Sequence, residues 1–347
     1  MDNSVKVSFV VAMYNVAAYI EECMRSLCEQ TLDDIEIIVV DDCSTDNGRD
    51  VVLRTVEEYP KRKGQVRIVS HESNKGITET RKDGLLAAGG EYIHFIDGDD
   101  YVDVRMAELM YSKAVEVDAD IVICGFWGFG GCYTEGNYYT FPLPEESLTD
   151  TDSIRDATLN GFGWPNVWCR MFRRELLLDK RMVWPVASMA EDVIITSAVT
   201  LIAKKIAYTT EALYYYRSQP NSIMNNRSAE GILKRFNGFV KNNEVLFSFL
   251  EENGVADKYQ RGIVEYKVRA KNELFPLFPS FKYRKIWLKT YPEMNRVMFF
   301  GNSIFKSTYR EKIWFVAQLL GLYPRFSKIL LSKRLKPDFI CRYNAIK

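Results

Sequence analysis

Residues 35–46 read IEIIVVDDCSTD, and this stretch decides the fold. Five of its first six residues are isoleucine or valine, and the apolar run ends abruptly in two aspartates. A nearly continuous run of β-branched residues is typical of a strand that is covered on both faces of a sheet. The stretch therefore predicts a buried strand whose end carries carboxylates.

The first 125 residues repeat this kind of unit. Further buried strands are predicted at 5–13, 66–70, 92–97 and 120–125. Helical spacing separates the strands at 17–30, 47–59, 77–88 and 104–117. Strand–helix–strand alternation predicts an α/β fold with a parallel, doubly wound sheet. Because ligands of such sheets bind at the carboxyl ends of the strands, the residues after each strand are the candidate site.

The pattern changes from about residue 126. A helical stretch at 191–204 precedes a β-rich run at 206–217, and the chain from about residue 228 is aromatic-rich and mainly helical. With 347 residues, 47% of them apolar, the chain has enough material for two domains with full cores. This composition excludes the disordered and collagen-like classes.

Cysteine and histidine usage narrows the chemistry. None of the seven cysteines stands in a CxxC pair, and the first residues show no basic segment followed by an apolar one, so we expect a cytoplasmic protein. No apolar stretch reaches the ~18 residues of a membrane span. Only two histidines are present, which disfavours a His-rich zinc site or a Ser-His-Asp hydrolase. The chemistry therefore has to rest mainly on carboxylates.

The strand predicted at 92–97 ends in a second acidic cluster, Asp97-Gly98-Asp99-Asp100. Asp97 and Asp99 can direct oxygens at one hard cation, Mg²⁺ or Mn²⁺, and such a cation would neutralise a diphosphate. The same residues also suit a simple Asx turn. Their position after a buried strand, opposite another acidic strand end, favours the metal site.

Asp41 and Asp42 end the strand quoted at the outset. Asp42 can accept a hydrogen bond from an N–H of a flat base such as uracil. The segment 44–46 is explained by capping of the helix that follows, whose positive end also favours aspartates. We favour a functional role for Asp42 and leave Asp41 open.

A third acidic pair, Glu191 and Asp192, opens the helical stretch 191–204. Ser188 and Glu191 match the Ser-x-x-Glu pattern of a capping box, so Glu191 is interpreted as structural. Asp192 is left over, and it serves either the helix dipole or general-base catalysis. The helix end would lower its pKa and burial would raise it.

Together these motifs resemble the GT-A-fold, family 2 inverting glycosyltransferases. The similarity runs from about Val5 to Ser222. Its pieces are VSFVVAMYN at 7–15, IVVDDCSTD at 38–46, NKG at 74–76 with Arg81, GEYIHFIDGDD at 90–100, Glu191-Asp192, and YYYR at 214–217 with Asn221-Ser222. The resemblance implies a GT-A (Rossmann-like, nucleotide-diphospho-sugar transferase) fold, a doubly wound mixed sheet with a helical C-terminal extension.

The resemblance also implies a domain organisation. Residues 1–225 would form the glycosyltransferase domain, with a nucleotide-sugar half at 1–100 and an acceptor half at 101–225. Residues 226–347 would form a basic, aromatic-rich helical region.

For the nucleotide, the resemblance implies contacts at the ends of the first two strands. Asp42 would contact the base, in a pocket that is lined by Ala12, Tyr14 and Asn15. The family usually has proline where Ala12 stands and glycine where Cys43 stands. These departures leave open whether the nucleotide is UDP or another.

For the chemistry, the resemblance implies roles for four further residues. Arg81 would lie near the diphosphate or orient an aspartate, although a lone arginine on a helix is more often a solvated charge. Asp97 and Asp99 would form the DxD motif, with Asp97 beside the nucleotide and Asp99 the more direct ligand of Mn²⁺ or Mg²⁺. Asp192 would deprotonate the acceptor hydroxyl. Lys82 also departs from the family, which commonly has asparagine there.

Charge is distributed unevenly along the chain. The stretch from Lys282 to Lys347 has 15 basic and 3 acidic residues, a net +12, although the whole chain has 46 of each. Within it, 303–323 mixes aromatic residues with lysine and arginine. This pattern fits either an interfacial helix on anionic lipid or a helix packed on the core. The basic excess favours peripheral contact with the inner face of the cell membrane through 303–347.

The sequence therefore predicts a metal-dependent, inverting glycosyltransferase that takes a nucleotide sugar, with UDP favoured, and a saccharide or lipid-linked acceptor. The QxxRW motif and membrane spans of processive synthases are missing from the sequence, so we expect one sugar per encounter. The expected setting is cell-surface polysaccharide synthesis. No nucleic acid is expected, because the site is acidic. The alternatives are a nucleotidyltransferase, which would need a glycine-rich loop after the first strand, and a catalytically silent sugar-nucleotide-binding or membrane-surface scaffold protein.

Overall fold

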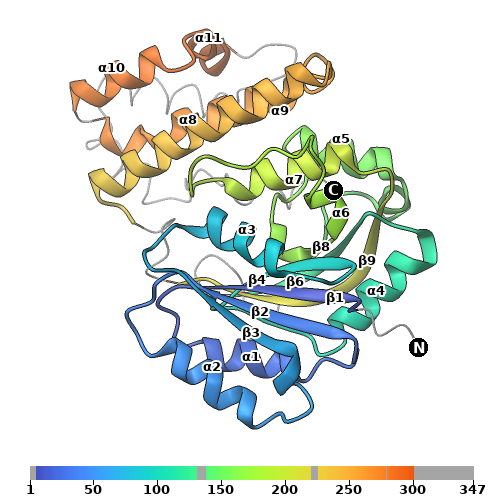
Figure 1. Cartoon of the computed structure of the whole chain (residues 1–347). Coiled ribbons are helices and arrows are strands. Elements are labelled where there is room, and N and C mark those ends of the chain that lie inside the picture. The colour runs from blue at the N-terminus through green and yellow to red at the C-terminus, as the bar shows by residue number, and fades with distance from the viewer. Residues whose placement is uncertain (1–4, 131–137, 220–225, 279, 301–347) are drawn as a thin grey trace. The chain divides into compact units, whose positions relative to one another are not determined.

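The computed structural model describes residues 5–130, 138–219, 226–278 and 280–300 (Figure 1). The chain divides into two compact units, 1–155 with 164–220 and 156–163 with 221–347. The first unit contains the sheet, and the described part of the second is helical. The segment 303–347, to which the sequence assigns membrane contact, lies outside the described residues.

In the described residues, nine strands form one mixed sheet: β1 (Val7–Met13), β2 (Ile35–Asp41), β3 (Val66–Ser70), β4 (Tyr92–Asp97), β5 (Tyr101–Val102), β6 (Ile121–Phe129), β7 (Tyr138–Tyr139), β8 (Arg170–Arg173) and β9 (Ile206–Arg217). Their order is β3-β2-β1-β4-β8-β6-β9-β5, and β7 pairs with β6. The first four are parallel, whereas β8 is antiparallel to both β4 and β6. The expected doubly wound mixed sheet is confirmed.

The helices of the described residues are α1 (Ile20–Cys28), α2 (Gly48–Glu57), α3 (Ile77–Ala87), α4 (Met106–Val117), α5 (Thr151–Leu159), α6 (Arg174–Leu177), α7 (Glu191–Ile202), α8 (Ala229–Glu252), α9 (Gln260–Glu273), α10 (Phe281–Lys289) and α11 (Glu293–Phe300). Figure 1 shows α1 and α2 on one face of the parallel strands and α3 on the other. No described helix is long and apolar enough to cross a bilayer.

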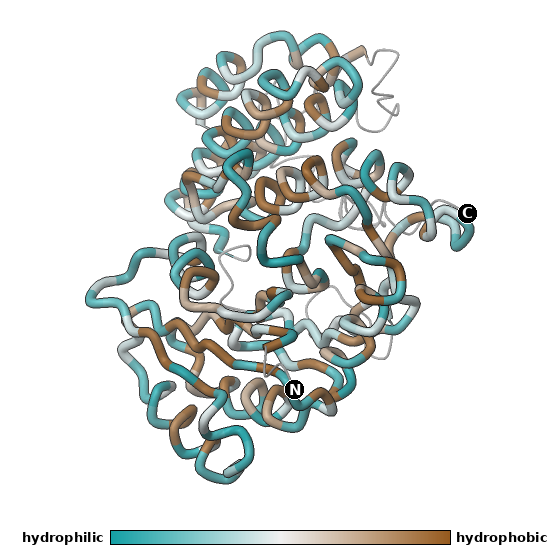
Figure 2. Tube along the Cα trace, turned by 45° about the vertical axis from the view of Figure 1, so that its right-hand side comes forward, coloured by the Kyte–Doolittle hydropathy of each residue, from teal (hydrophilic) through white to brown (hydrophobic). Residues whose placement is uncertain are grey.

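The parallel strands form the core of the first unit. Every residue of β2 is buried, and so is every residue of β1 except Ala12. Figure 2 shows apolar residues along the strands and mostly polar residues on the outer turns of the helices. Each fully buried valine or isoleucine contributes about 1.5–3 kcal/mol relative to an exposed one, which explains why continuous β-branched runs occupy these positions.

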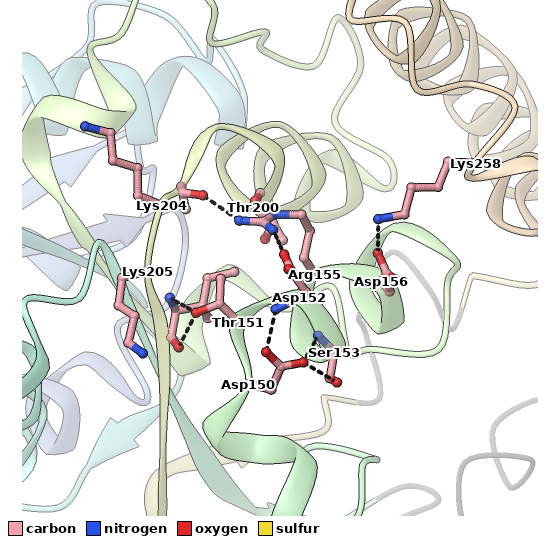
Figure 3. A network of polar contacts seen from close by, with 12 residues as sticks. Asp150, Thr151, Asp152, Ser153, Arg155, Asp156, Thr200, Lys204, Lys205 and Lys258 are labelled. Carbon is pink, nitrogen blue, oxygen red and sulfur yellow. Dashed lines mark hydrogen bonds and ion pairs between the residues drawn. The ribbon is translucent and has the colours of Figure 1, made fainter.

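Helix α7 is fixed at its C-terminal end by an arginine of α5. Arg155 Nε donates to the carbonyl of Thr200 at 3.2 Å (Figure 3), and Nη2 donates to the carbonyl of Ala203 at 2.7 Å. The last carbonyls of a helix have no partners within the helix, so an arginine here both satisfies and positions them. This matters for the site because the first turn of α7 carries Glu191 and Asp192.

The second unit has its own apolar core. Trp287 of α10 is fully buried against Phe275, Phe278 and Val268. Lys271 of α9 is also buried, and its ammonium group donates to the carbonyls of Trp287 and Thr290 at the end of α10. Burial lowers the pKa of Lys271 to about 7. The inner face of α10 is therefore anchored by both packing and hydrogen bonds.

Candidate functional site

The ends of β2, β1 and β4 meet at one edge of the sheet. Strand register places Met13 opposite Asp41 on one side of β1 and Ala12 opposite Asp97 on the other. The backbone N–H of Asp42 donates to the carbonyl of Met13 at 2.9 Å. The two acidic strand ends predicted from the sequence therefore flank the end of β1.

Arg81 joins three carboxylates from distant parts of the chain. Its Nη2 donates to Asp97 Oδ1 at 3.0 Å, and its Nη1 donates to Asp192 Oδ1 at 2.9 Å and to Glu191 Oε1 at 3.1 Å. Arg81 is 2% exposed, so the interpretation as a solvated surface charge is wrong. A buried guanidinium with a planar fork suits simultaneous contact with several carboxylates.

The electrostatics of this cluster follow from burial and mutual charge. Burial and the neighbouring Asp192 raise the pKa of Glu191, against the opposing effect of Arg81. Burial also raises the pKa of Asp192, while Arg81 and the backbone N–H of Val167 lower it. Burial disfavours the charge of Arg81, but the carboxylates of Asp192, Asp97 and Glu191 outweigh it and raise the pKa of the guanidinium. Arg81 is thus a fixed positive charge in an acidic site.

The other two aspartates of the 97–100 cluster differ from each other. Asp100 is buried, and its carboxylate accepts hydrogen bonds from the Tyr214 hydroxyl at 2.8 Å and from the backbone N–H of Arg217 at 2.7 Å. Both oxygens of Asp100 therefore accept hydrogen bonds from residues of β9. Asp99 forms no ion pair with the described residues, and burial, with Asp97 nearby, raises the pKa of its carboxyl to about 6.

This donor set fits a hard divalent cation. The carboxylate of Asp99 is desolvated and close to a second negative charge, Asp97, which is the situation that a bound cation relieves. No cluster of three or more potential metal-binding side chains occurs in the described residues. The protein would therefore supply two carboxylates, and the remaining ligands would come from a diphosphate and water, as is usual for Mg²⁺.

Asp42 is held by the loop after β3. Its Oδ1 accepts from His71 Nδ1 at 2.7 Å and from the backbone N–H of Lys75 at 2.7 Å, and its Oδ2 accepts from the backbone N–H of Gly76 at 2.8 Å. Asp42 is 3% exposed. A carboxylate can accept about four hydrogen bonds, so Oδ2 keeps one position for an N–H donor.

His71 is sandwiched between two carboxylates. Its Nε2 lies 2.9 Å from Asp83 Oδ2, while its Nδ1 faces Asp42. The imidazole ring thereby links the Asp42 carboxylate to the Asp83 carboxylate. His71 thus positions Asp42.

Of the other residues predicted to line the base pocket, Ala12 lies in β1, and Tyr14 and Asn15 lie in the loop that follows it. Asn15 Oδ1 accepts from the backbone N–H of Thr45 at 2.8 Å, and the backbone N–H of Asn15 donates to Ser44 Oγ at 3.1 Å. Tyr14 is 48% exposed. Asn15 therefore clamps the loop after β1 to the loop after β2, and its neighbour Tyr14 leaves part of its ring accessible.

Two sequence interpretations of helix capping need correction or refinement. Helix α7 begins at Glu191 after Ala190, whose φ of 58° is left-handed, and no side chain caps this helix end. The Ser188–Glu191 capping box is therefore wrong, and the Glu191 carboxylate contacts Arg81 instead. The N-cap residue of α2 is Asn47, whose side chain makes no capping hydrogen bond. Asp46, one position earlier, accepts from the backbone N–H of Gly48 at 3.0 Å and from that of Ala17 at 2.8 Å.

Cys43 occupies a backbone conformation that favours glycine. Its φ is 63°, in the left-handed region, and glycine is the usual residue of the resembling family at this position. A side chain in this region costs roughly 1–2 kcal/mol, and the greater freedom of unfolded glycine offsets part of that cost.

We expect Cys43→Gly to raise the free energy of unfolding by about 0.5–1 kcal/mol, measured by urea denaturation. Cys28→Gly, at the end of α1, is the control that should lower it, and a less stable Cys43→Gly would contradict the argument.

Sequence reasoning missed His71, Tyr214 and Glu191 as functional parts of the site. A role for Glu191 could have been predicted, because two adjacent carboxylates, Glu191 and Asp192, can share one positively charged partner. His71 and Tyr214 contact the acidic residues only through pairing of distant segments. Tyr214 belongs to the YYYR piece of the resemblance, which assigned it no role, and no local pattern marks His71.

Comparison with known proteins shows the family of the chain. The family model "Glycosyl transferase family 2" matches residues 8–179. The chain is 36% identical over 223 residues to the uncharacterized glycosyltransferase EpsJ of Bacillus subtilis, and this match covers 62% of each chain. It is 30% identical over 263 residues to the putative glycosyltransferase EpsH of the same organism, covering 74% of this chain and 72% of that one.

Solved structures share the fold. A crystal structure of Staphylococcus aureus TarS 1-349 in complex with UDP-GlcNAc superimposes with a TM-score of 0.54 and 19% identity, covering 92% of this chain and 91% of that one. The mannosyltransferase PcManGT of Pyrobaculum calidifontis, in complex with GDP-Man and Mn²⁺, gives a TM-score of 0.52 and 16% identity, covering 94% and 88%.

The mixed sheet, with acidic residues at its strand ends, defines a GT-A-type glycosyltransferase fold. The chain belongs to glycosyl transferase family 2.

Proposed function

We propose that this protein is a metal-dependent, inverting glycosyltransferase that moves one sugar at a time from a nucleotide-diphosphate donor, UDP-linked, to a saccharide or glycolipid acceptor. The observation that carries the proposal is the Arg81 cluster. One guanidinium links Asp97, at the end of β4, to Asp192, at the start of α7. The residue proposed to hold the leaving group and the residue proposed to activate the nucleophile therefore belong to one site.

The donor would bind at the ends of β1, β2 and β4. Asp42 would accept from an N–H of the base, with Ala12, Tyr14 and Asn15 beside it. Asp97 and Asp99 would hold Mn²⁺ or Mg²⁺, which stabilises the negative charge that develops on a departing diphosphate. The complexes of TarS with UDP-GlcNAc and of the mannosyltransferase with GDP-Man and Mn²⁺ support a nucleotide sugar as the donor class.

Asp192 would act as the general base. Its carboxylate takes the proton of the acceptor hydroxyl, the oxygen forms a bond to the anomeric carbon, and the bond from that carbon to the diphosphate oxygen breaks. The electron pair leaves with the nucleoside diphosphate, so attack in line with the leaving group inverts the anomeric centre. Arg81 positions the Asp192 carboxylate, and its charge opposes the rise in the pKa of Asp192 that burial causes.

The donor class is tested by a thermal-shift screen of nucleotides and nucleotide sugars with and without Mn²⁺. The proposal expects UDP or a UDP-sugar to stabilise the protein, and to do so more strongly when Mn²⁺ is present. Stabilisation without transfer to any acceptor would favour the scaffold alternative. No stabilisation by any nucleotide would contradict the proposal.

Asp99→Ala tests the metal site. We expect Mn²⁺-dependent UDP binding to fall by about 10²-fold and transfer by about 10³-fold, because the carboxylate supplies a direct ligand and charge stabilisation. Calorimetry of UDP binding with and without Mn²⁺ measures the first effect. Asp34→Ala, which removes a surface partner of Lys6, is the control and should match the wild type. Wild-type metal dependence in Asp99→Ala would remove Asp99 from the site.

A further inference from the structure

Helix α10 presents an unusual outer face. Its exposed residues are Phe281, Lys282, Lys285, Leu288 and Lys289, which we call the α10 outer face. At about 100° per residue these five side chains fall within roughly 120° of arc, on the side opposite the buried Trp287. Phe281 is 73% exposed and Leu288 is 45% exposed. Water therefore contacts two large apolar side chains and three ammonium groups on one surface.

This face is not an ordinary solvated helix surface. Solvated faces carry mixed charges, whereas α10 has four basic residues and no acidic one. Within the described part of the chain, Lys282, Lys285 and Lys289 form no ion pair, and the next acidic residue, Glu293, is taken by Lys267 at 2.8 Å. Among the residues that the structure describes, the positive charge of the face is thus not paired.

The face is also held in a fixed orientation within its unit. Trp287 is buried in the apolar core, and the ammonium group of Lys271 lies 3.9 Å from the centre of its ring. Lys271 also binds the carbonyls at the end of the helix. The helix cannot turn Phe281 inward without removing Trp287 from the core.

We propose that the α10 outer face docks on an anionic lipid bilayer. Phe281 and Leu288 would enter the boundary between headgroups and acyl chains, and Lys282, Lys285 and Lys289 would meet the lipid phosphates. Charge complementarity selects this occupant. Residues 301–347 contain ten basic and two acidic residues, so this segment would repel the face, and a second copy would oppose lysines with lysines. A nucleic acid would meet the lysines but leave Phe281 and Leu288 in water.

The inference deepens the proposed function, because docking would bring the site to a lipid-linked acceptor. The choice of acceptor rests on the proposed function, whereas lipid binding itself does not. It involves residues other than 303–347. Lipid binding is measured without nucleotide, so its failure and the failure of sugar transfer are distinguishable.

Flotation of the full chain with vesicles tests the proposal. We expect binding to vesicles that contain about one third phosphatidylglycerol, little binding to pure phosphatidylcholine, and weaker binding as salt rises. Replacing Lys282, Lys285 and Lys289 together by glutamine should weaken binding roughly 100-fold, at about fivefold per lysine. Phe281→Ser should weaken it roughly tenfold.

Matched controls separate this face from general surface properties. Lys61, Lys63 and Lys113, replaced together by glutamine, remove the same charge from the sheet unit, and Leu86→Ser removes another exposed apolar side chain. Both controls should float as the wild type does, and thermal unfolding of all variants should confirm that they fold. Wild-type flotation of the α10 variants overturns the proposal. Two further results would overturn it. One is that duplex DNA competes for the protein while Phe281→Ser has no effect on flotation. The other is that Phe281→Ser abolishes a dimer without reducing flotation.

Discussion

Asp192→Asn is expected to reduce sugar transfer by about 10³-fold while leaving Mn²⁺-dependent UDP binding intact. The amide keeps the shape of the side chain, and its oxygen can still accept from Arg81 Nη1, which now contacts the carboxylate at 2.9 Å. It cannot take a proton from the acceptor hydroxyl. The loss should therefore fall on kcat, with little change in donor affinity.

Glu191→Gln decides between the two carboxylates on Arg81. Because burial and Asp192 raise the pKa of Glu191, its carboxylate is the less suited to remain charged, and we expect a loss of no more than about tenfold. Steady-state transfer by both variants gives the comparison, with Asp179→Asn as a surface control that should behave as the wild type does. A larger loss in Glu191→Gln than in Asp192→Asn would move the base to Glu191.

Arg81→Met is expected to lower the free energy of unfolding by about 3–5 kcal/mol, since removing one partner of a buried ion cluster leaves the other charges unpaired. Asp97, Glu191 and Asp192 would then lie together without the guanidinium that bridges them. Transfer should fall by more than 10²-fold even below the melting temperature, because neither carboxylate of α7 would be held toward β4.

Urea denaturation measures this destabilisation, and Arg25→Met provides the control. Arg25 also contacts two carboxylates, Glu21 and Glu58, but its side chain and theirs are substantially exposed, so a much smaller loss than that of Arg81→Met is expected. Equal effects of the two substitutions would show that the Arg81 cluster is no stronger than a surface network. Arg81→Lys, which keeps the charge but loses the fork, should fall between Arg81→Met and the wild type.

The sequence predicted the parallel half of the sheet closely because burial on both faces demands continuous apolar runs. The bounds of β2, β3 and β4 agree with the expected segments. Strand β8, Arg170–Arg173, was not predicted, because two of its four residues are arginines and it is stabilised by pairing with β4 and β6. A local sequence pattern indicates which residues are buried. It does not indicate an antiparallel strand that forms only by pairing with strands distant in the sequence.

The candidate site was predictable to the extent that it follows from strand ends. Asp42, Asp97 and Asp99 lie at or just after the ends of predicted strands. Because the carboxyl ends of parallel strands lie at the same edge of a sheet, the sequence predicts that these aspartates lie near one another. The contact between Arg81 and Asp192 spans 111 positions of the chain. The resemblance to a known family implied only that Arg81 would lie near the diphosphate or orient an aspartate, without saying which one. The start of α7 at Glu191 agrees with the predicted helix, and only its capping was misjudged, because Ala190 adopts a left-handed conformation that the sequence pattern does not indicate.

The charge balance around Arg81 has a consequence for the order of arrival of ligands. One permanent positive charge faces Asp97, Glu191 and Asp192, and Asp99 adds a further carboxyl close by. A bare diphosphate approaching this edge of the sheet would meet net repulsion at short range, where like charges interact strongly. The donor is therefore expected to enter already chelated, and cation-free nucleotide to remain largely in solution.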